Sequence, residues 1–173
     1  MSTTLPPVTL VLGGARSGKS KHAESLIEAA GGGLYVATAE AWDDEMKQRI
    51  RLHRERRGPQ WDSTEAPIDL ISAIRDASRP VLVDCLTIWL SNLMHYEQDV
   101  DAAINGLIDA LGSAPQPVVL VSNELGLGIV PENALARRFR DEHGRMNQMV
   151  AGAASRVIFV AAGLPLELKD ERL

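Results

Sequence analysis

Apolar residues along the chain gather in short runs, which are separated by longer stretches with helical spacing. The runs cover residues 8–12, 34–38, 81–84, 118–121 and 157–160. Nearly continuous apolar runs of this length are typical of strands that are buried on both faces, as in a parallel sheet. The pattern therefore predicts the central strands of such a sheet, with a further extended segment at 61–65 and an edge strand at 166–168.

The stretches between the runs repeat apolar residues every three or four positions, which predicts helices. The expected helices cover residues 19–30, 42–57, 67–77, 86–96, 99–111 and a long segment that begins at 131. Pro67 and Pro131 suit the first turn of a helix. Buried strands that alternate with helices predict an α/β fold: a mostly parallel sheet with helices on both faces and an antiparallel edge strand.

The chain has 173 residues and no internal repeat or linker, which predicts a single domain over 1–173. Pro6-Pro7 predicts a flexible tail at 1–7. No apolar run approaches the roughly 20 residues that span a membrane, and the first residues lack a signal-peptide pattern. A single cysteine, Cys85, allows no disulfide within the chain, which suits a reducing cytoplasm. The net charge of −5 argues against a nucleic-acid binder.

The most specific motif of the chain lies between its first predicted strand and first predicted helix. The segment reads Gly13, Gly14, Ala15, Arg16, Ser17, Gly18, Lys19 and Ser20. This is the phosphate-binding pattern G-x-x-x-x-G-K-[ST], in which backbone N–H groups and a helix N-terminus cradle a phosphate chain. We expect Lys19 to reach the β- and γ-phosphates and the Ser20 hydroxyl to ligate Mg²⁺. The motif predicts a P-loop NTPase (RecA-like) three-layer fold that uses a nucleoside triphosphate.

Two other features bear on the site. Asp84 ends the apolar run 81–84, which is the Walker B arrangement that holds Mg²⁺ or its water in P-loop proteins. The segment 49–57 is the densest basic stretch of the chain, and it includes His53. Taken alone, the arginines fit either a solvated helix face or a site, and a lone histidine on an apolar stripe is more often structural.

The P-loop leaves the reaction open among kinases, ATPases, GTPases and nucleotidyl transferases. The chain lacks the guanine-reading N-K-x-D motif of GTPases, and it is small for a motor or transporter ATPase. A small-molecule transferase remains as the prediction.

Several further segments, taken with the P-loop, resemble one family from about residue 8 to residue 160. That family is the bifunctional adenosylcobinamide kinase / adenosylcobinamide-phosphate guanylyltransferase of cobalamin biosynthesis. The resembling segments are 35–39, 43–46, 49–50, 53–54, 83–87, 89–93, 122–133, 135–141 and 144–148.

The resemblance implies two reactions. In the first, ATP or GTP phosphorylates the hydroxyl of the aminopropanol side chain of adenosylcobinamide. In the second, GMP passes from GTP to the resulting phosphate through a guanylyl-histidine, which gives adenosylcobinamide-GDP and pyrophosphate. The matching histidine is His53. A neutral imidazole is a good nucleophile near pH 7 because its ordinary pKa is about 6.5, and nearby arginines would offset phosphate charge.

The resemblance also implies further nucleotide-binding residues and a quaternary structure. The nucleotide-binding positions are Ala37, Thr38, Ala39, Arg54, Arg56, Arg57, Glu65 and Asp84. Glu65 and Asp84 are alternatives for reading guanine or serving Mg²⁺, and related chains carry Glu at position 84, so an Asp there would reach the metal through water. Family members are described as homotrimers. Trp89, Leu90, Leu93 and Met94 are then either interface residues or, as their helical spacing favours, core residues.

Two other functions stay open. One is a guanylyltransferase without effective kinase activity, although intact Lys19 and Ser20 give no sign of that loss. The other is a GTP-binding switch or assembly factor, which would hydrolyse GTP slowly, bind a protein partner and form no covalent nucleotide. Of the remaining histidines, His22 lies just past the P-loop on the first predicted helix, where it could support the site from behind. His95 and His143 carry no supporting motif, and we interpret both as structural or exposed.

Overall fold

The computed structural model describes residues 4–40 and 58–171, and it arranges them around one seven-stranded sheet. The first half of the described chain forms β1 (Val8–Gly13), α1 (Lys19–Ala29), β2 (Gly33–Ala37), β3 (Trp61–Glu65), α3 (Leu70–Arg75) and β4 (Val81–Asp84). The second half forms α4 (Leu86–His95), α5 (Val100–Gly112), β5 (Val118–Asn123), α6 (Ala134–Ala153), β6 (Arg156–Ala161) and β7 (Leu164–Asp170).

The strand order is β3-β2-β4-β5-β1-β6-β7. Every neighbouring pair is parallel except β6 and β7, which are antiparallel. The predicted α/β fold, with its mostly parallel sheet and its antiparallel edge strand, is therefore confirmed. One strand, β5, separates the P-loop strand β1 from β4, which carries Asp84.

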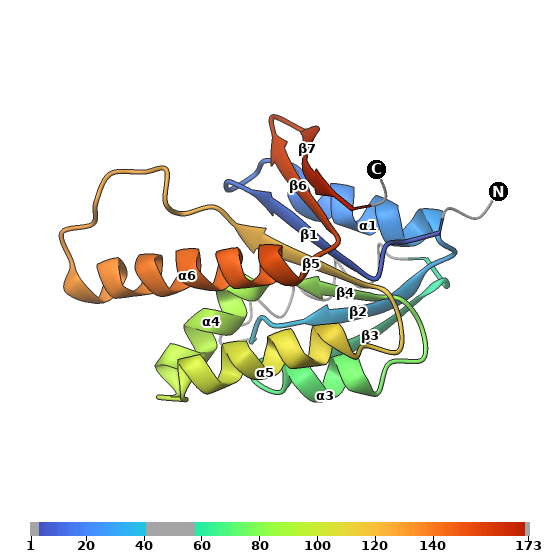
Figure 1. Cartoon of the computed structure of the whole chain (residues 1–173), viewed down its shortest axis with the longest axis horizontal. Coiled ribbons are helices and arrows are strands. Elements are labelled where there is room, and N and C mark those ends of the chain that lie inside the picture. The colour runs from blue at the N-terminus through green and yellow to red at the C-terminus, as the bar shows by residue number, and fades with distance from the viewer. Residues whose placement is uncertain (1–3, 41–57, 172–173) are drawn as a thin grey trace.

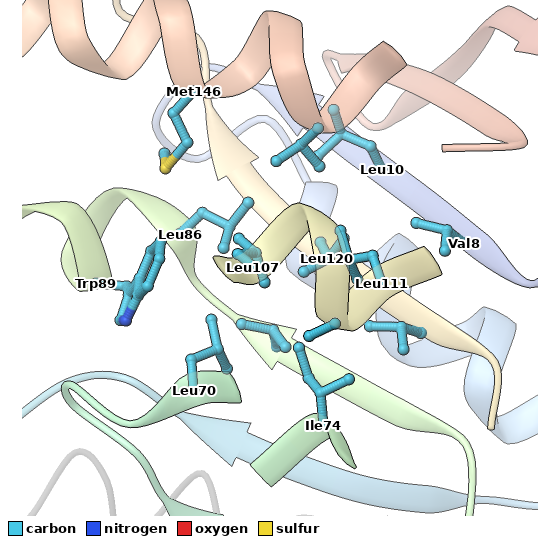
Figure 2. Close-up of a cluster of buried hydrophobic side chains, with 14 of the residues drawn as sticks. Val8, Leu10, Leu70, Ile74, Leu86, Trp89, Leu107, Leu111, Leu120 and Met146 are labelled. Atoms are coloured by element: carbon cyan, nitrogen blue, oxygen red, sulfur yellow. The ribbon is translucent and has the colours of Figure 1, made fainter. Parts of the chain in front are cut away.

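Helices cover the two faces of the sheet unequally (Figure 1). Among the described elements, α1 packs on one face, where Ala23 and Ile27 are fully buried against Val11, Leu82 and Val119. Helices α3, α4, α5 and α6 pack on the other face and bury the larger apolar cluster. Figure 2 shows how that cluster brings Leu10 of β1 and Leu120 of β5 together with side chains from all four helices.

The ends of several elements differ from the sequence-based boundaries. Helix α3 begins at Leu70 because the Asp69 side chain accepts a hydrogen bond from Ser72 N, 3.1 Å, so Pro67 lies before the helix. Helix α6 begins at Ala134, where Asn133 caps it in the same way, so Pro131 also lies outside. Capping side chains satisfy the first free N–H groups of a helix, and here they override the proline signal.

The segment before β1 is packed, although Pro6-Pro7 predicted a flexible tail over 1–7. Leu5 contacts the smaller apolar cluster, Pro6 is buried, and the Pro7 carbonyl accepts from Val118 N at 2.9 Å. Pro7 therefore extends the parallel pairing of β1 with β5, and Leu5 and Pro6 pack against the protein. Residues 1–3 lie outside the described part.

Candidate active site

The carboxyl ends of the parallel strands form one edge of the sheet, and the P-loop rises from the end of β1 at this edge. Gly13 closes the strand in a space that admits no side chain, because an added Cβ would lie 2.4 Å from Ser17 Oγ and 2.6 Å from the Val160 carbonyl oxygen. Gly18 has φ +95° directly before α1, a conformation that favours glycine. The two glycines thus shape the turn from strand to helix.

Hydrogen bonds fix the loop from both sides. Ser17 N donates to the Gly14 carbonyl at 3.3 Å, and Gly163 N, from the β6–β7 turn, donates to the Ser17 carbonyl at 2.8 Å. Lys19 Nζ donates to the Gly14 carbonyl at 3.1 Å, so the ammonium group lies across the loop. Ala15, Arg16 and Gly18 are exposed, whereas Ser17 is buried and Ser20 is half-buried in the first turn of α1. Hydrogen bonds therefore hold the base of the loop in place, whereas its tip is open to solvent.

Asp84, at the end of β4, lies on the same face of the sheet as α1. Its Oδ2 accepts a hydrogen bond from the Tyr35 hydroxyl of β2 at 2.8 Å, and the residue is half-buried. Parallel pairing aligns Ala37 with Asp84 on one side and with Glu65 on the other. Glu65, at the end of edge strand β3, is exposed. Asp84 and Glu65 therefore flank Ala37 in one row across the sheet edge.

The segment after β2 is held by the start of α4. The Thr38 hydroxyl is fully buried; it accepts from Cys85 N and donates to the Cys85 carbonyl, both at 2.8 Å. Asn92 Nδ2 donates to the Thr38 carbonyl at 2.8 Å. Glu40 accepts from the Tyr96 hydroxyl at 2.9 Å. The predicted Ala37–Thr38–Ala39 segment thus has a fixed backbone beside Asp84.

Behind the edge lies a buried polar network that sequence reasoning missed. His143 of α6 is 1% exposed, and its Nε2 lies 2.9 Å from Thr87 Oγ1, in the first turn of α4. Thr87 Oγ1 accepts from Asn123 N at 2.9 Å, at the end of β5. Asn147 Nδ2 donates to the Asn123 carbonyl at 3.0 Å, and Ser122 Oγ donates to Asn147 Oδ1 at 2.7 Å. The network therefore ties the end of β5 to both α4 and α6.

Burial of His143 within this network disfavours its charged form. Burial lowers the pKa of His143 below its ordinary value, and the negative charge of Glu124 partly offsets this effect. Of the two expected alternatives for His143, structural or exposed, its burial excludes the exposed one. His95 is exposed. The spacing of His143 and Asn147, one helical turn apart, was the only sequence signal for the network.

Glu124 follows β5 directly and touches the base of the P-loop. Its backbone N donates to the Gly13 carbonyl at 3.1 Å, which continues the pairing of β5 with β1. Its carboxylate Oε1 accepts from Gly126 N at 2.6 Å. Glu124 lies in the resembling segment 122–133, but the sequence alone indicated no role for it.

The structure gathers the described candidates at one edge, in two groups. The P-loop residues lie at β1, whereas the Ala37–Ala39 segment, Glu65 and Asp84 lie at the ends of β2, β3 and β4. The other candidates lie outside the described residues; they are His53, Arg54, Arg56 and Arg57. Of the alternative interface residues, Trp89, Leu90 and Leu93 are buried in the core, and Met94 is partly buried against it.

The residues at this edge fit Mg²⁺ as far as their chemistry goes. Within 4–40 and 58–171, the structure shows no cluster of three histidine, cysteine or acidic side chains that would bind a metal alone. Mg²⁺ is usually bound by one or two protein oxygens together with phosphate oxygens and waters. The Ser20 hydroxyl and the Asp84 carboxylate are oxygen donors of that kind on the α1 side of the edge. No helix in the described part of the chain is long and apolar enough to cross a membrane.

Comparison with known proteins gives matches over nearly the whole chain. The family model for cobinamide kinase / cobinamide phosphate guanyltransferase matches residues 9–168. The bifunctional adenosylcobalamin biosynthesis protein CobP of Pseudomonas aeruginosa is 47% identical over 170 residues, 95% of this chain and 98% of that protein. The corresponding protein CobU of Escherichia coli (strain K12) is 43% identical over 178 residues, 92% of this chain and 98% of that protein.

A solved structure supports the fold alone. The flagellar accessory protein FlaH from Methanocaldococcus jannaschii superposes with a TM-score of 0.55 over 96% of this chain and 80% of that chain, at 13% identity. At this identity the likeness carries no information on substrate. It agrees with the α/β fold that the sequence predicted.

Proposed function

The chain belongs to the cobinamide kinase / cobinamide phosphate guanyltransferase family, and from this premise we propose how its own residues perform the two reactions. The first reaction phosphorylates the side-chain hydroxyl of adenosylcobinamide with ATP or GTP. The second transfers GMP from GTP to that phosphate and releases pyrophosphate. The observation that carries the proposal is the family match over residues 9–168 with an intact P-loop at the end of β1.

In the kinase reaction, the P-loop holds the triphosphate. Backbone N–H groups of residues 13–20 point to the phosphate chain, and the N-terminus of α1 adds the positive end of its dipole. Lys19 Nζ, now bonded to the Gly14 carbonyl, moves to the β- and γ-phosphates and offsets the charge that develops in the transition state. Bound Mg²⁺ would neutralise phosphate charge beside Ser20 and Asp84.

In the guanylyltransferase reaction, His53 is the nucleophile. Its unprotonated ring nitrogen attacks the α-phosphorus of GTP, a P–N bond forms, and pyrophosphate leaves with the electron pair of the broken P–O bond. The phosphate of the corrinoid then attacks the same phosphorus, and the P–N bond breaks. Arg54, Arg56 and Arg57 neutralise the triphosphate during this step. The two steps replace one difficult displacement.

The row Asp84–Ala37–Glu65 supports separate roles for the two acids. Neighbouring strands lie about 4.8 Å apart, so Asp84 is about 10 Å from β1 and Glu65 about 19 Å from it. The metal of a nucleotide binds its phosphates directly and the base lies farther from them, so the nearer acid suits the metal and the farther acid suits the base. We therefore assign Asp84 to Mg²⁺, through a water, and Glu65 to the guanine N1–H and 2-amino donors, which suit an acceptor-only side chain.

The test is incubation with Mg²⁺ and GTP labelled at the α-phosphate, followed by a denaturing gel and mass spectrometry. Wild-type protein should carry an acid-labile, base-stable label, as a histidine phosphoramidate does, and His53→Ala should carry none. Label that persists on His53→Ala would assign the nucleophile to another residue. The absence of label on both proteins, with cobinamide phosphate left unchanged, would contradict the guanylyltransferase function.

We also propose that the protein works in the cytoplasm as a homotrimer. The single cysteine, Cys85, is a free and buried thiol, which suits a reducing compartment. Leu127, Ile129 and Val130 are exposed to 83%, 96% and 61% in the segment between β5 and α6, an arrangement typical of interaction surfaces. Sedimentation equilibrium at several protein concentrations tests the trimer, and a monomer throughout would contradict it.

A further inference from the structure

The acidic residues at the carboxyl edge differ in their distance from the P-loop. Glu65 ends the edge strand β3, and Asp84 ends β4, which β5 separates from β1. Glu40 follows β2 and accepts from Tyr96. Glu124 alone among these acids follows the strand that pairs with β1, and its backbone N donates to the Gly13 carbonyl at 3.1 Å. Its backbone therefore adjoins the first residue of the P-loop.

The carboxylate of Glu124 is held at one oxygen. Oε1 accepts from Gly126 N at 2.6 Å, while no partner of Oε2 is found within the described ranges. The residue is half-buried. A carboxylate that is oriented through one oxygen presents the other in a fixed direction, as a proton acceptor requires.

The backbone that carries Glu124 is held by the buried network. Ser122 donates to Asn147 Oδ1, Asn123 N donates to Thr87 Oγ1, and Asn147 donates to the Asn123 carbonyl. His143 lies against Thr87 at 2.9 Å. Four side chains from α4, α6 and β5 thus fix the two residues before Glu124. Support of this kind sets the position of a reactive group to within a fraction of an ångström.

The two proposed reactions differ in their need for a proton acceptor. A hydroxyl that attacks phosphorus must lose its proton, and kinases supply a carboxylate for this step. A phosphate acceptor has a second pKa of about 6, so it is already ionised at neutral pH. The imidazole of His53 attacks through a lone pair. Only phosphorylation of the hydroxyl therefore calls for a base.

We propose that Glu124 is the proton acceptor of the kinase reaction and has no chemical part in guanylyl transfer; this inference rests on the proposed function. As the hydroxyl oxygen bonds to the γ-phosphorus, its proton passes to Glu124 Oε2. The bond from the γ-phosphorus to the β,γ-bridging oxygen breaks, and its electron pair leaves with the nucleoside diphosphate. Glu124 then returns the proton to water.

The test compares three activities of Glu124→Gln with those of wild type. Phosphorylation of cobinamide should lose about 10²- to 10⁴-fold in kcat, the usual contribution of a general base. Labelling of the protein by α-labelled GTP should be unchanged. Transfer of that label to cobinamide phosphate, supplied ready-made, should also be unchanged. These last two activities report that the variant is folded and binds nucleotide.

Two further variants sharpen the test. Glu132→Gln removes an exposed carboxylate from the same connection and should leave all three activities unchanged. Glu124→Ala should regain kinase activity when formate is added, because a small carboxylate can fill the vacated space, whereas Glu124→Gln should not. Rescue of this kind is not expected of a residue that only stabilises the loop.

Three outcomes would overturn the inference. Equal losses in kinase activity and in protein labelling would show that Glu124 supports the P-loop rather than the proton transfer. Unchanged kinase activity in Glu124→Gln would show that no base is needed there. A wild-type protein that is labelled by GTP but does not phosphorylate cobinamide would remove the kinase function itself, and this inference with it.

Discussion

The two ends of the catalytic edge are built differently. On the side of β1 and β5, Asn123 bonds to Thr87 of α4 and Asn147 of α6. The next residue, Glu124, donates to the Gly13 carbonyl, and Gly163 of the β6–β7 turn donates to the P-loop at Ser17. On the side of β2 and β3, Glu65 is exposed on an edge strand, and the chain leaves Glu40 for the segment that carries His53. Phosphoryl transfer needs reacting atoms held to a fraction of an ångström, whereas recognition of a base tolerates a more adaptable surface.

The largest effect on the two reactions together should follow from removing Lys19, the cation on the β1 and β5 side of the edge. Lys19→Met leaves the developing phosphate charge without its ammonium partner, so phosphorylation of cobinamide should fall on the order of 10²- to 10³-fold. Protein labelling by GTP should fall as well, because both reactions use the bound triphosphate. Steady-state assays of both activities measure this, with Lys21→Met, at an exposed position of α1, as the matched control. Normal kinase activity in Lys19→Met would contradict the assigned role.

Two neighbouring glycines allow a direct test of how tightly the P-loop base is packed. Gly13→Ala places a Cβ at 2.4 Å from Ser17 Oγ and 2.6 Å from a backbone oxygen, whereas a Cβ at Gly14 meets nothing within 4 Å. We expect Gly13→Ala to lower the free energy of unfolding by about 1–3 kcal/mol and to weaken GTP binding, with Gly14→Ala close to wild type in stability. Urea unfolding and GTP titration measure the two effects. Equal behaviour of the two variants would show that the loop base is not close-packed.

Breaking a hydrogen bond of the buried network should lower the free energy of unfolding somewhat less than Gly13→Ala does. Thr87→Val keeps the shape of the side chain but leaves Asn123 N–H without an acceptor, so stability should fall by about 1–2 kcal/mol. Thr87→Ser retains the hydroxyl and should keep most of that stability. Hydrogen exchange at the Asn123 amide gives a local readout, since its protection should drop in Thr87→Val alone. Unchanged protection there would mean that the hydroxyl does not hold the strand end.

On the side of β2 and β3, a substitution of the exposed Glu65 should change the selectivity for GTP over ATP rather than the stability of the protein. Glu65→Gln replaces a carboxylate that we assign to guanine, so the preference for GTP over ATP should fall about tenfold, the loss of one charged hydrogen bond. Because Glu65 is exposed, the unfolding free energy should stay within about 0.5 kcal/mol of wild type. Competition of ATP against labelled GTP measures the preference. An unchanged ratio would exclude Glu65 as the base-reading residue.

The smallest expected effect is a pH dependence of stability that comes from His143 in the buried network. The native pKa of His143 is lowered by burial, so between the unfolded value of about 6.5 and the native value the unfolded chain binds a proton that the native chain does not. Stability should therefore fall as the pH drops through about 6.5, and level off for this residue below its native pKa. Urea unfolding between about pH 7.5 and pH 5.5 measures the slope, which should be shallower in His143→Leu.

The sequence predicted the strands of this fold well because strands buried on both faces form continuous apolar runs. It predicted the P-loop equally well, since strand, glycines, lysine and helix are contiguous. The helix starts at Leu70 and Ala134 were missed because a capping side chain, Asp69 or Asn133, decides them locally. The packing of residues 4–7 was missed because it depends on β5, more than a hundred positions away.

The buried polar network that supports the site could not be predicted from the sequence, for a different reason. Thr87, Asn123 and His143 meet only when α4, β5 and α6 pack together. Thr87 and Asn123 stood in resembling segments, but no local pattern indicated that they contact one another. Glu124 stood in a resembling segment, but its importance follows from strand order, because β5 lies between β1 and β4. Strand order is a tertiary property that no periodicity in this sequence encodes.

The place of β1 inside the sheet, between β5 and β6, has a consequence for how the protein is made. This strand leaves the ribosome before the other described strands, yet its two partners, β5 and β6, are made much later, and the Val8–Ser155 contact spans 147 positions. The turn that donates to Ser17, at Gly163, is later still. Parallel strands that are far apart in sequence pair slowly, because the chain loses conformational entropy in closing the long loop before the strand contacts can stabilise it. A nascent chain therefore has a complete P-loop sequence long before it has a P-loop structure, and loss of its last strands would leave the nucleotide site unbuilt.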